Sequence, residues 1–96
     1  MKKWNAALAW KVQFEATARK ELSRLDHAVQ RDILRFLRER IATGEDPKRF
    51  GDPLRKNLSG LWKYRLGAYR LICEIHNERV LVLVVRVGHR REVYPQ

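Results

Sequence analysis

The C-terminal third of the chain constrains the fold most, because its pattern predicts two consecutive β-hairpins. Two segments rich in aromatic and β-branched residues, Leu61–Leu66 and Tyr69–His76, flank the dipeptide Gly67-Ala68. Glycine at the first of two central turn positions favours a type II′ turn, whose twist matches that of the flanking strands. Such a turn predicts a register in which Arg65 faces Arg70 across the hairpin.

Alternation of side chains along each strand divides this first hairpin into a charged and an apolar face. The charged face carries Lys63, Arg65 and Arg70. The apolar face carries Trp62, Tyr64, Leu66, Tyr69, Leu71 and Cys73. Two arginines directly opposite each other destabilise a hairpin by up to about 1 kcal/mol. A local rule broken in this way points to function, most simply the binding of an anion such as phosphate. Arginine stems spread into water on a solvated surface are the alternative.

A second hairpin is predicted because Asn77-Glu78 offers the next turn. The segment Arg79–Val87 after it is apolar on both faces, as a central strand would be. A two-residue loop at this turn sets Arg70 opposite Val85 and sends the residues after the strand toward the charged face. We therefore expect one cluster at the end of the sheet, formed by Lys63, Arg65, Arg70, His89, Arg90 and Tyr94.

The N-terminal half predicts one short strand and two helices. Residues 10–14 alternate between apolar and polar side chains, as in a strand. Helical spacing follows over Ala16–Leu25, and Asp26 is a good N-cap for a second helix that Gly44 ends. The apolar stripe of that second helix is Val29, Ile33, Phe36 or Leu37, and Ile41. The segment Glu45–Asn57 contains two prolines and a glycine and is predicted to be a loop.

The element order β-α-α-β-β-β predicts an α+β fold, in which a helical hairpin packs on a small, mainly antiparallel sheet. A length of 96 residues allows one modest core, so residues 1–96 are expected to form a single domain. The polar side of the helices is strongly basic and is expected to be solvated, with some offset from Glu21, Asp32 and Glu39.

A formal net charge of +10 and a pI near 10.5 favour a polyanionic partner. Nucleic acid is the leading class and an acidic protein the second. A membrane surface fits poorly, since the basic residues are spread over helices and strands. The single cysteine, Cys73, excludes a disulfide framework, and no Cys/His spacing predicts a metal site. The apolar run near the start is too short for a secretory signal, so we expect a cytoplasmic protein.

The predicted cluster offers positive charge, an imidazole and a phenol, without a facing pair of carboxylates. These groups suit the cleavage of RNA by its own 2′-hydroxyl, because the substrate then supplies the nucleophile. Arginines stabilise the charge that develops on the phosphate, while a base takes the 2′ proton and an acid protonates the leaving 5′ oxygen.

Two segments, LSGLWKYRLGAYRLI from Leu58 to Ile72 and VGHRREVY from Val87 to Tyr94, resemble the RelE toxins of the RelE/ParE superfamily. The early strand, followed by Lys20-Glu21-Leu22 and Leu25-Asp26, is similar to the opening of that family, so the resemblance covers nearly the whole chain. The pattern Leu-x-Lys/Arg…Tyr-Arg-Leu is specific when it is joined to Val-Gly-x-Arg…Glu-Val-Tyr at this distance.

The resemblance implies the toxin of a type II toxin–antitoxin system. Such a toxin is a metal-independent endoribonuclease without a cofactor, which cuts mRNA in the A site of the 70S ribosome and is neutralised by a cognate acidic antitoxin. By position, Lys63 and Arg65 match the basic pair before the turn. Arg70 matches the phosphate-holding arginine, Arg90 the arginine at the leaving group, and Tyr94 the aromatic residue near the C-terminus.

This chain departs from the family pattern at two of these positions. Arg65 stands where the best-known members have lysine, and arginine deprotonates too reluctantly to be a base. His89 stands where some members have lysine, and histidine is the natural proton carrier near neutral pH. The general base is therefore open between Lys63, His89 and Tyr94.

Two other functions fit the same sequence less well. A ParE-like toxin that binds DNA gyrase without cutting RNA shares the fold, but that branch generally lacks the basic and tyrosine set found here. A plain RNA-binding module would need exposed aromatic residues for base stacking, and the hairpins put most of theirs on the helix-packing side.

Overall fold

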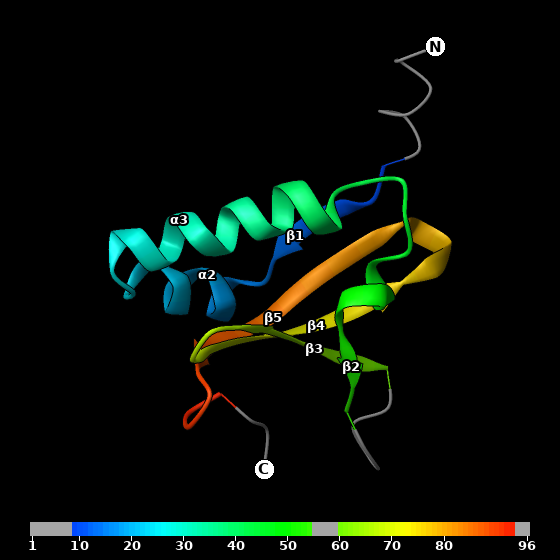
Figure 1. The fold of residues 1–96 in the computed structure, drawn as a ribbon. Coiled ribbons are helices and arrows are strands. Elements are labelled where there is room, and N and C mark those ends of the chain that lie inside the picture. Colours follow the sequence, from blue (N-terminus) through cyan, green and yellow to red (C-terminus); the bar gives the residue numbers. More distant parts are fainter. Residues whose placement is uncertain (1–8, 55–59, 94–96) are drawn as a thin grey trace.

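The protein forms two layers, with two helices covering one face of a five-stranded sheet (Figure 1). The computed structural model describes residues 9–54 and 60–93. The elements in chain order are β1 (Lys11–Phe14), α2 (Ala16–Ser23), α3 (His27–Phe36), the π-helical turn η1 (Leu37–Ile41), the 3₁₀ turn η2 (Pro47–Phe50), β2 (Asp52–Pro53), β3 (Leu61–Leu66), β4 (Tyr69–His76), the 3₁₀ turn η4 (Asn77–Arg79) and β5 (Leu81–His89). The predicted α+β fold, with a helical hairpin on a small, mainly antiparallel sheet, is confirmed.

The strand order of the sheet is β1-β5-β4-β3-β2. β1 pairs with β5 in parallel, and the other neighbours are antiparallel. β5 is therefore a central strand, as its apolar sequence predicted. Its buried side chains are Leu81, Val82, Val84 and Val87.

The β3–β4 hairpin has the predicted turn and register. Gly67 has φ +59°, whereas Ala68 does not have a positive φ, which is the pattern of a type II′ turn. Arg65 pairs directly with Arg70. Because the turn fixes the register locally, the two arginines must share one face of the sheet.

The β4–β5 hairpin differs from the prediction in both turn and register. The connection is a 3₁₀ turn that ends at Val80, which has φ 51°, and the ladder contains an irregularity at Ile72/Cys73. Arg70 consequently lies opposite Gly88 and not opposite Val85. The longer turn shifts the register by two residues and the bulge by one more. An odd total shift moves each side chain after the bulge to the other face.

The two helices form the predicted antiparallel hairpin, with small differences at their ends. α2 ends at Ser23, two residues before the predicted end. Asp26 occupies the N-cap position of α3, but its side chain accepts no capping hydrogen bond. The helix ends at Ile41 and not near Gly44, because its last turn widens and the Ala42 N–H donates to the Leu37 carbonyl at 2.7 Å.

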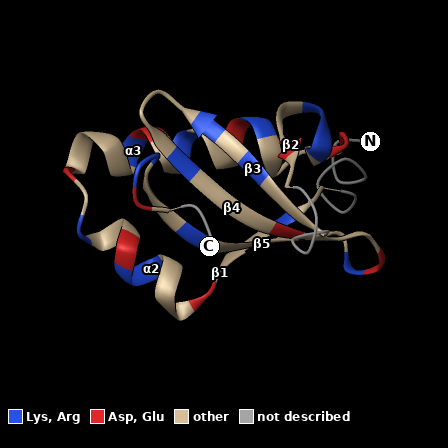
Figure 2. Cartoon of the chain, turned by 90° about the horizontal axis from the view of Figure 1, so that it is seen from below, with Lys and Arg blue, Asp and Glu red and all other residues tan. Residues whose placement is uncertain are grey.

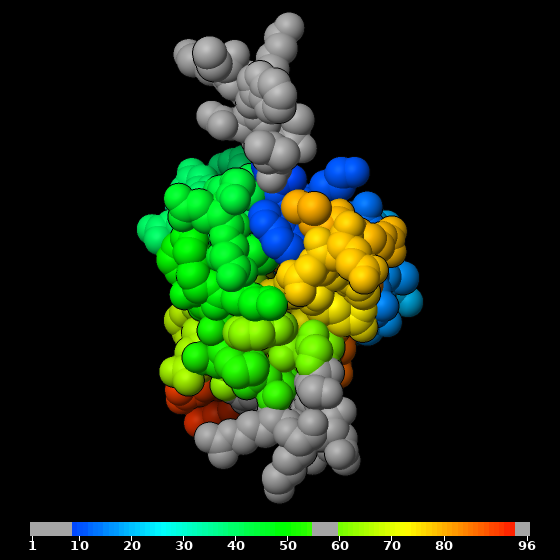
Figure 3. Space-filling view, turned by 90° about the vertical axis from the view of Figure 1, so that its right-hand side faces the viewer, coloured from blue at the N-terminus to red at the C-terminus, as the bar shows by residue number. Residues whose placement is uncertain are grey.

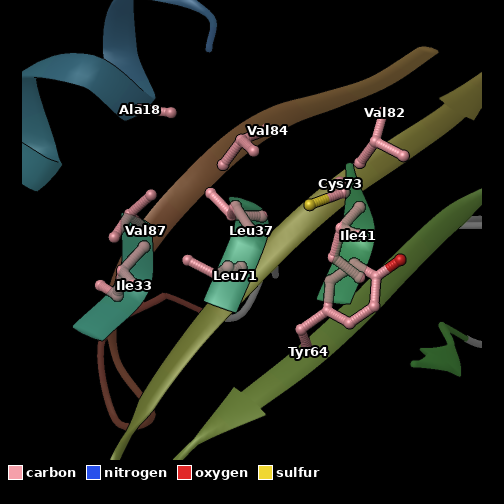
Figure 4. Packing of buried hydrophobic residues seen from close by; sticks show 10 residues of the cluster. All are labelled: Ala18, Ile33, Leu37, Ile41, Tyr64, Leu71, Cys73, Val82, Val84 and Val87. Atoms are coloured by element: carbon pink, nitrogen blue, oxygen red, sulfur yellow. The ribbon is translucent and has the colours of Figure 1, made fainter. Parts of the chain in front are cut away.

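The core lies between the helices and the sheet (Figure 4). Ile33, Leu37 and Ile41 from the α3–η1 stripe point at the sheet and are at most 3% exposed. Tyr64 from β3 is fully buried beneath them, and its hydroxyl donates to the Pro47 carbonyl at 2.7 Å. Burial raises the pKa of the Tyr64 phenol above its ordinary value, as does the charge of Cys73 and Asp46.

The segment predicted as the loop Glu45–Asn57 contains two short elements as far as residue 54, and its last residues lie outside the described part. Asp46 begins η2 by accepting the Lys48 N–H at 2.9 Å. β2 then pairs with β3 as an edge strand, a position that tolerates Pro53. Figure 3 shows this side of the molecule, where the segment (green) lies beside the β4–β5 turn (yellow).

Candidate functional site

The face of the sheet opposite the helices carries the predicted basic cluster on β3 and β4 (Figure 2). Lys63 pairs with Ile72 and Arg65 with Arg70, so Lys63, Arg65 and Arg70 share this face. Arg65 is exposed, whereas Arg70 is only 8% exposed. The like charges are therefore separated by depth, with one guanidinium in water and the other within the protein.

Arg70 is held by the turn that precedes it. Its Nη1 donates to the carbonyls of Gly67 at 2.7 Å and Tyr69 at 2.8 Å. Its Nε is buried without a hydrogen-bond partner, and no Asp or Glu of residues 9–54 and 60–93 forms an ion pair with it. A buried cation is costly unless it is paired. Arg70 is thus a fixed positive charge that no carboxylate of the described residues neutralises.

Arg65 has a weak carboxylate partner on the neighbouring edge strand. Its Nε lies 3.6 Å from Asp52 Oδ2, and the two side chains are 62% and 56% exposed. An exposed pair of this length contributes little to stability and competes weakly with another anion. Asp52 also lies opposite Lys63 in the β2–β3 register.

The chain turns back directly after β5. The Arg90 N–H donates to the Ala68 carbonyl at 2.8 Å, and the N–H groups of Glu92 and Val93 donate to the His89 carbonyl. Val93 is 1% exposed and packs over Gly88, where an added Cβ would lie 3.5 Å from the Val93 Cβ. Consecutive carbonyls of the β3–β4 turn therefore hold both the Arg70 side chain and the Arg90 backbone.

His89 lies on the face of the sheet that carries the helices. It pairs with Tyr69, the two ring centroids lie 5.8 Å apart at 76°, and His89 Nδ1 accepts the Arg91 N–H at 3.2 Å. The predicted placement of His89 on the face of Arg70 is wrong, because the register shift in β5 is odd. Tyr94 lies outside the described residues, so its place in the cluster stays a prediction.

An ion pair that the sequence did not predict lies beside the cluster, between Glu21 on α2 and Arg86 on β5. Arg86 Nε and Nη2 each lie 3.0 Å from Glu21 Oε2, while Glu21 Oε1 accepts the Val87 N–H at 2.8 Å. The pair borders a pocket of about 380 Å³, which is also lined by Tyr69 and His89. We had expected Glu21 to offset arginines of the helix surface, as Asp32 and Glu39 do for Arg35 and Arg38.

The family comparison matches residues 12–94 to a model described as the ParE toxin of the type II toxin–antitoxin system parDE. The chain belongs to this family. This ParE-family toxin is 33% identical to the toxin RelG of Mycobacterium tuberculosis over 87 residues, covering 91% of this chain and 98% of RelG.

Solved structures agree with the family assignment. The toxin–antitoxin complex RelBE2 of Mycobacterium tuberculosis contains a chain that matches with a TM-score of 0.79 and 32% identity, covering 92% of this chain and 99% of that one. The isolated RelE toxin of E. coli matches with a TM-score of 0.67 and 26% identity, covering 84% of each chain. The predicted resemblance to RelE toxins is confirmed, and the protein is the toxin of a type II toxin–antitoxin system of the RelE/ParE superfamily.

Two further observations bear on ligands of this toxin. Among the described residues, no group of three His, Cys, Asp or Glu side chains is arranged to hold a metal ion. Within the same residues, no helix has the length and apolar character needed to span a membrane. On the face opposite the helices, the site brings together the guanidinium groups of Arg65 and Arg70 and the ammonium group of Lys63.

Proposed function

We propose that this toxin is an endoribonuclease that cuts mRNA in the A site of the 70S ribosome, with the 2′-hydroxyl of the message as nucleophile. The observation that carries the proposal is Arg70, a buried cation without a carboxylate partner among the described residues. A phosphate bound beside this guanidinium would compensate its charge. Transition-state charge on a phosphoryl group is the kind that a preorganised arginine stabilises best.

The residues around Arg70 take different parts in this reaction. Arg65 lies beside Arg70 and contributes charge only, since arginine stays protonated. Lys63 shares their face, two residues from Arg65 on the same strand, and is a candidate proton carrier. The backbone N–H of Arg90 is bound to Ala68, in the turn that also holds Arg70. We assign the Arg90 side chain to the leaving 5′ oxygen.

His89 and Tyr94 are the other two candidate bases, and they differ in what the structure says of their positions. His89 projects from the helix side of β5, so it can reach the phosphate only around the end of the strand. Tyr94 follows Val93, which packs against the strand end at Gly88. We therefore rank Lys63 ahead of His89 for the 2′ proton, while Tyr94, outside the described residues, stays an open candidate.

The proposed partners follow from charge and from the relatives. A net charge of +10 on 96 residues favours association with the polyanionic ribosome and its message. Related chains are known in toxin–antitoxin complexes, including RelBE2. We propose a cognate acidic antitoxin that denies RNA access to Arg70 and Arg90, and a cytoplasmic site of action for both proteins.

Mapping of 5′ ends on a programmed ribosome tests the proposal. A short mRNA with a defined A-site codon is incubated with the toxin, once with 70S ribosomes and once alone. We expect cleavage at one position within the A-site codon on the ribosome and negligible cleavage of free RNA. Equal cleavage in both samples would refute ribosome dependence, and no cleavage in either would refute the nuclease.

One observation favours a second function, because the matched family model is described by the name of ParE. A ParE-like toxin would bind DNA gyrase and leave RNA intact. Supercoiling by purified gyrase in the presence of the toxin separates the two functions. Inhibition of gyrase, together with intact mRNA on the ribosome, would replace the nuclease by this alternative.

A further inference from the structure

The end of β5 has a neighbouring strand on one side only. β1 pairs with β5 over Leu81–Val84, and its last link is the Glu15 N–H, which donates to the Val84 carbonyl at 2.9 Å. β4 accompanies β5 as far as His89. In the described part of the chain, residues 85–89 thus lack a strand on the β1 side.

Glu21 fills the place that a strand would take. α2 packs against β5, and Glu21 Oε1 accepts the Val87 N–H at 2.8 Å. The other oxygen, Oε2, accepts the Arg86 Nε–H at 3.0 Å and forms an ion pair with Arg86 Nη2, also at 3.0 Å. The Glu21 side chain is 21% exposed, so these charge-assisted bonds are partly shielded from water.

This contact is followed within three residues by the proposed site. After Val87, Gly88 lies opposite Arg70, and Arg90 is tied to the β3–β4 turn through Ala68. The strand end is therefore fixed by the turn on one side and by Glu21 on the other. A loosened strand end would shift Arg90 relative to Arg70 without removing either guanidinium.

We propose that Glu21 is a positioning residue, which orients the Arg90 segment toward Arg70 by accepting the Val87 N–H. The inference rests on the proposed nuclease function and adds a residue of α2 to it. The acceptor oxygen is the essential group, and Arg86 serves to hold the Glu21 carboxylate in place. Arg86 is thereby neutralised and takes no part in binding phosphate.

Four variants separate the acceptor role from the ion pair and from general stability. Glu21→Ala removes both contacts. Glu21→Gln keeps an oxygen for the Val87 N–H but loses the charge. The exchange Glu21→Arg with Arg86→Glu restores an ion pair but supplies no acceptor to Val87. Glu39→Ala is the matched control, because it removes an exposed glutamate whose one ion pair among the described residues is with Arg38, at 4.0 Å.

The first measurement is single-turnover cleavage of mRNA on programmed ribosomes, together with ribosome affinity. Small misplacements of a catalytic group can cost about a hundredfold in rate, so we expect Glu21→Ala to lose about tenfold to a hundredfold. Its affinity for the ribosome should be unchanged. Glu21→Gln and Glu39→Ala should stay near the wild-type rate, and the exchange variant should remain slow. A Glu21→Ala rate equal to that of Glu39→Ala, or full rescue by the exchange, would overturn the proposal.

Amide hydrogen exchange of the isolated toxin gives a readout that does not need activity. Glu21→Ala should lose protection at the amides of residues 86–90 and keep it in β3 and α3, whereas Glu21→Gln should resemble the wild type. Loss of protection throughout the chain would overturn the proposal in favour of a general stabilising role. If wild-type toxin cuts no RNA, the nuclease fails, and a local loss of protection still decides whether Glu21 holds the strand end.

Discussion

Arg65 and Arg70 face each other across the β3–β4 hairpin, yet only Arg65 has a carboxylate partner among the described residues. Arg70 is withdrawn to 8% exposure and held by the carbonyls of Gly67 and Tyr69. Burial of one of the two arginines thus reduces the repulsion expected between them. In exchange, the fold carries the free-energy cost of a buried Arg70 Nε without a hydrogen-bond partner. We therefore expect Arg70 to matter more for function than for stability.

Replacing Arg70 by methionine should separate function from stability. Removal of an uncompensated buried charge is often neutral or stabilising, so we expect Arg70→Met to keep the free energy of unfolding within about 1 kcal/mol of the wild type or to raise it. Urea denaturation followed by circular dichroism measures this change. A loss of several kcal/mol would mean that Arg70 is a structural residue.

Replacing the scissile 2′-hydroxyl by hydrogen should abolish cleavage, because the proposed nucleophile is then absent. The normal message should give a 2′,3′-cyclic or 3′ phosphate and a free 5′-hydroxyl, and a chelator that leaves the ribosome intact should not change the rate. Mass spectrometry of the fragments identifies both ends. Cleavage of the 2′-deoxy message at the normal rate would exclude this nucleophile.

Replacing Tyr64 by phenylalanine should destabilise the protein at neutral pH. The buried hydroxyl donates to the Pro47 carbonyl at 2.7 Å, and an unsatisfied buried partner costs about 1–3 kcal/mol. The loss should appear as a lower midpoint in urea. The substitution Tyr69→Phe, at a half-buried tyrosine with no hydrogen bond from its hydroxyl recorded among the described residues, is the control and should leave the midpoint unchanged.

Alkaline pH should destabilise the wild type through the same tyrosine. Burial raises the pKa of Tyr64 in the folded state above the ordinary value of 10.0. The unfolded chain therefore releases its proton first, and stability is lost as the pH rises above about 10. Thermal melts between pH 8 and pH 11 should show a shallower decline for Tyr64→Phe than for the wild type. Both proteins carry Cys73→Ala in this comparison, because the buried Cys73 thiol also has a raised pKa. Parallel declines would contradict the assignment of the alkaline loss of stability to Tyr64.

The antitoxin complex should weaken as salt increases. A toxin with a net charge of +10 gains much of its association with an acidic partner from electrostatic attraction, which ions screen. Titration calorimetry at low and physiological ionic strength measures the dissociation constant, which should rise with salt. If no complex forms at low salt, the proposal of an acidic antitoxin is refuted.

Local signals predicted the parts of this fold that depend on neighbouring residues. The Gly67-Ala68 turn predicted the β3–β4 register and with it the Arg65–Arg70 pair, because a two-residue loop leaves no freedom between its strands. The helical stripe predicted the buried positions Ile33 and Ile41 in the same way.

Features that depend on contacts between distant residues, or on irregular backbone geometry, were not predictable from the sequence. The 3₁₀ turn after β4 and the bulge near Ile72 have no distinctive residue pattern, and together they moved His89 to the helix side. The Glu21–Arg86 pair joins residues 65 positions apart. Its one sequence signal was the presence of Arg86 within an otherwise apolar strand.

The central claim is that Arg70 and Arg90 stabilise the transition state of RNA cleavage, and the single-turnover rate on a programmed ribosome tests it most directly. Losing one such contact typically lowers the rate about a hundredfold to a thousandfold, which we expect for Arg70→Ala and for Arg90→Ala with ribosome affinity nearly unchanged. Arg31→Ala, which removes an exposed arginine of α3, should keep the wild-type rate. A double variant, Arg70→Ala with Arg90→Ala, that cleaves as fast as the wild type would contradict the claim.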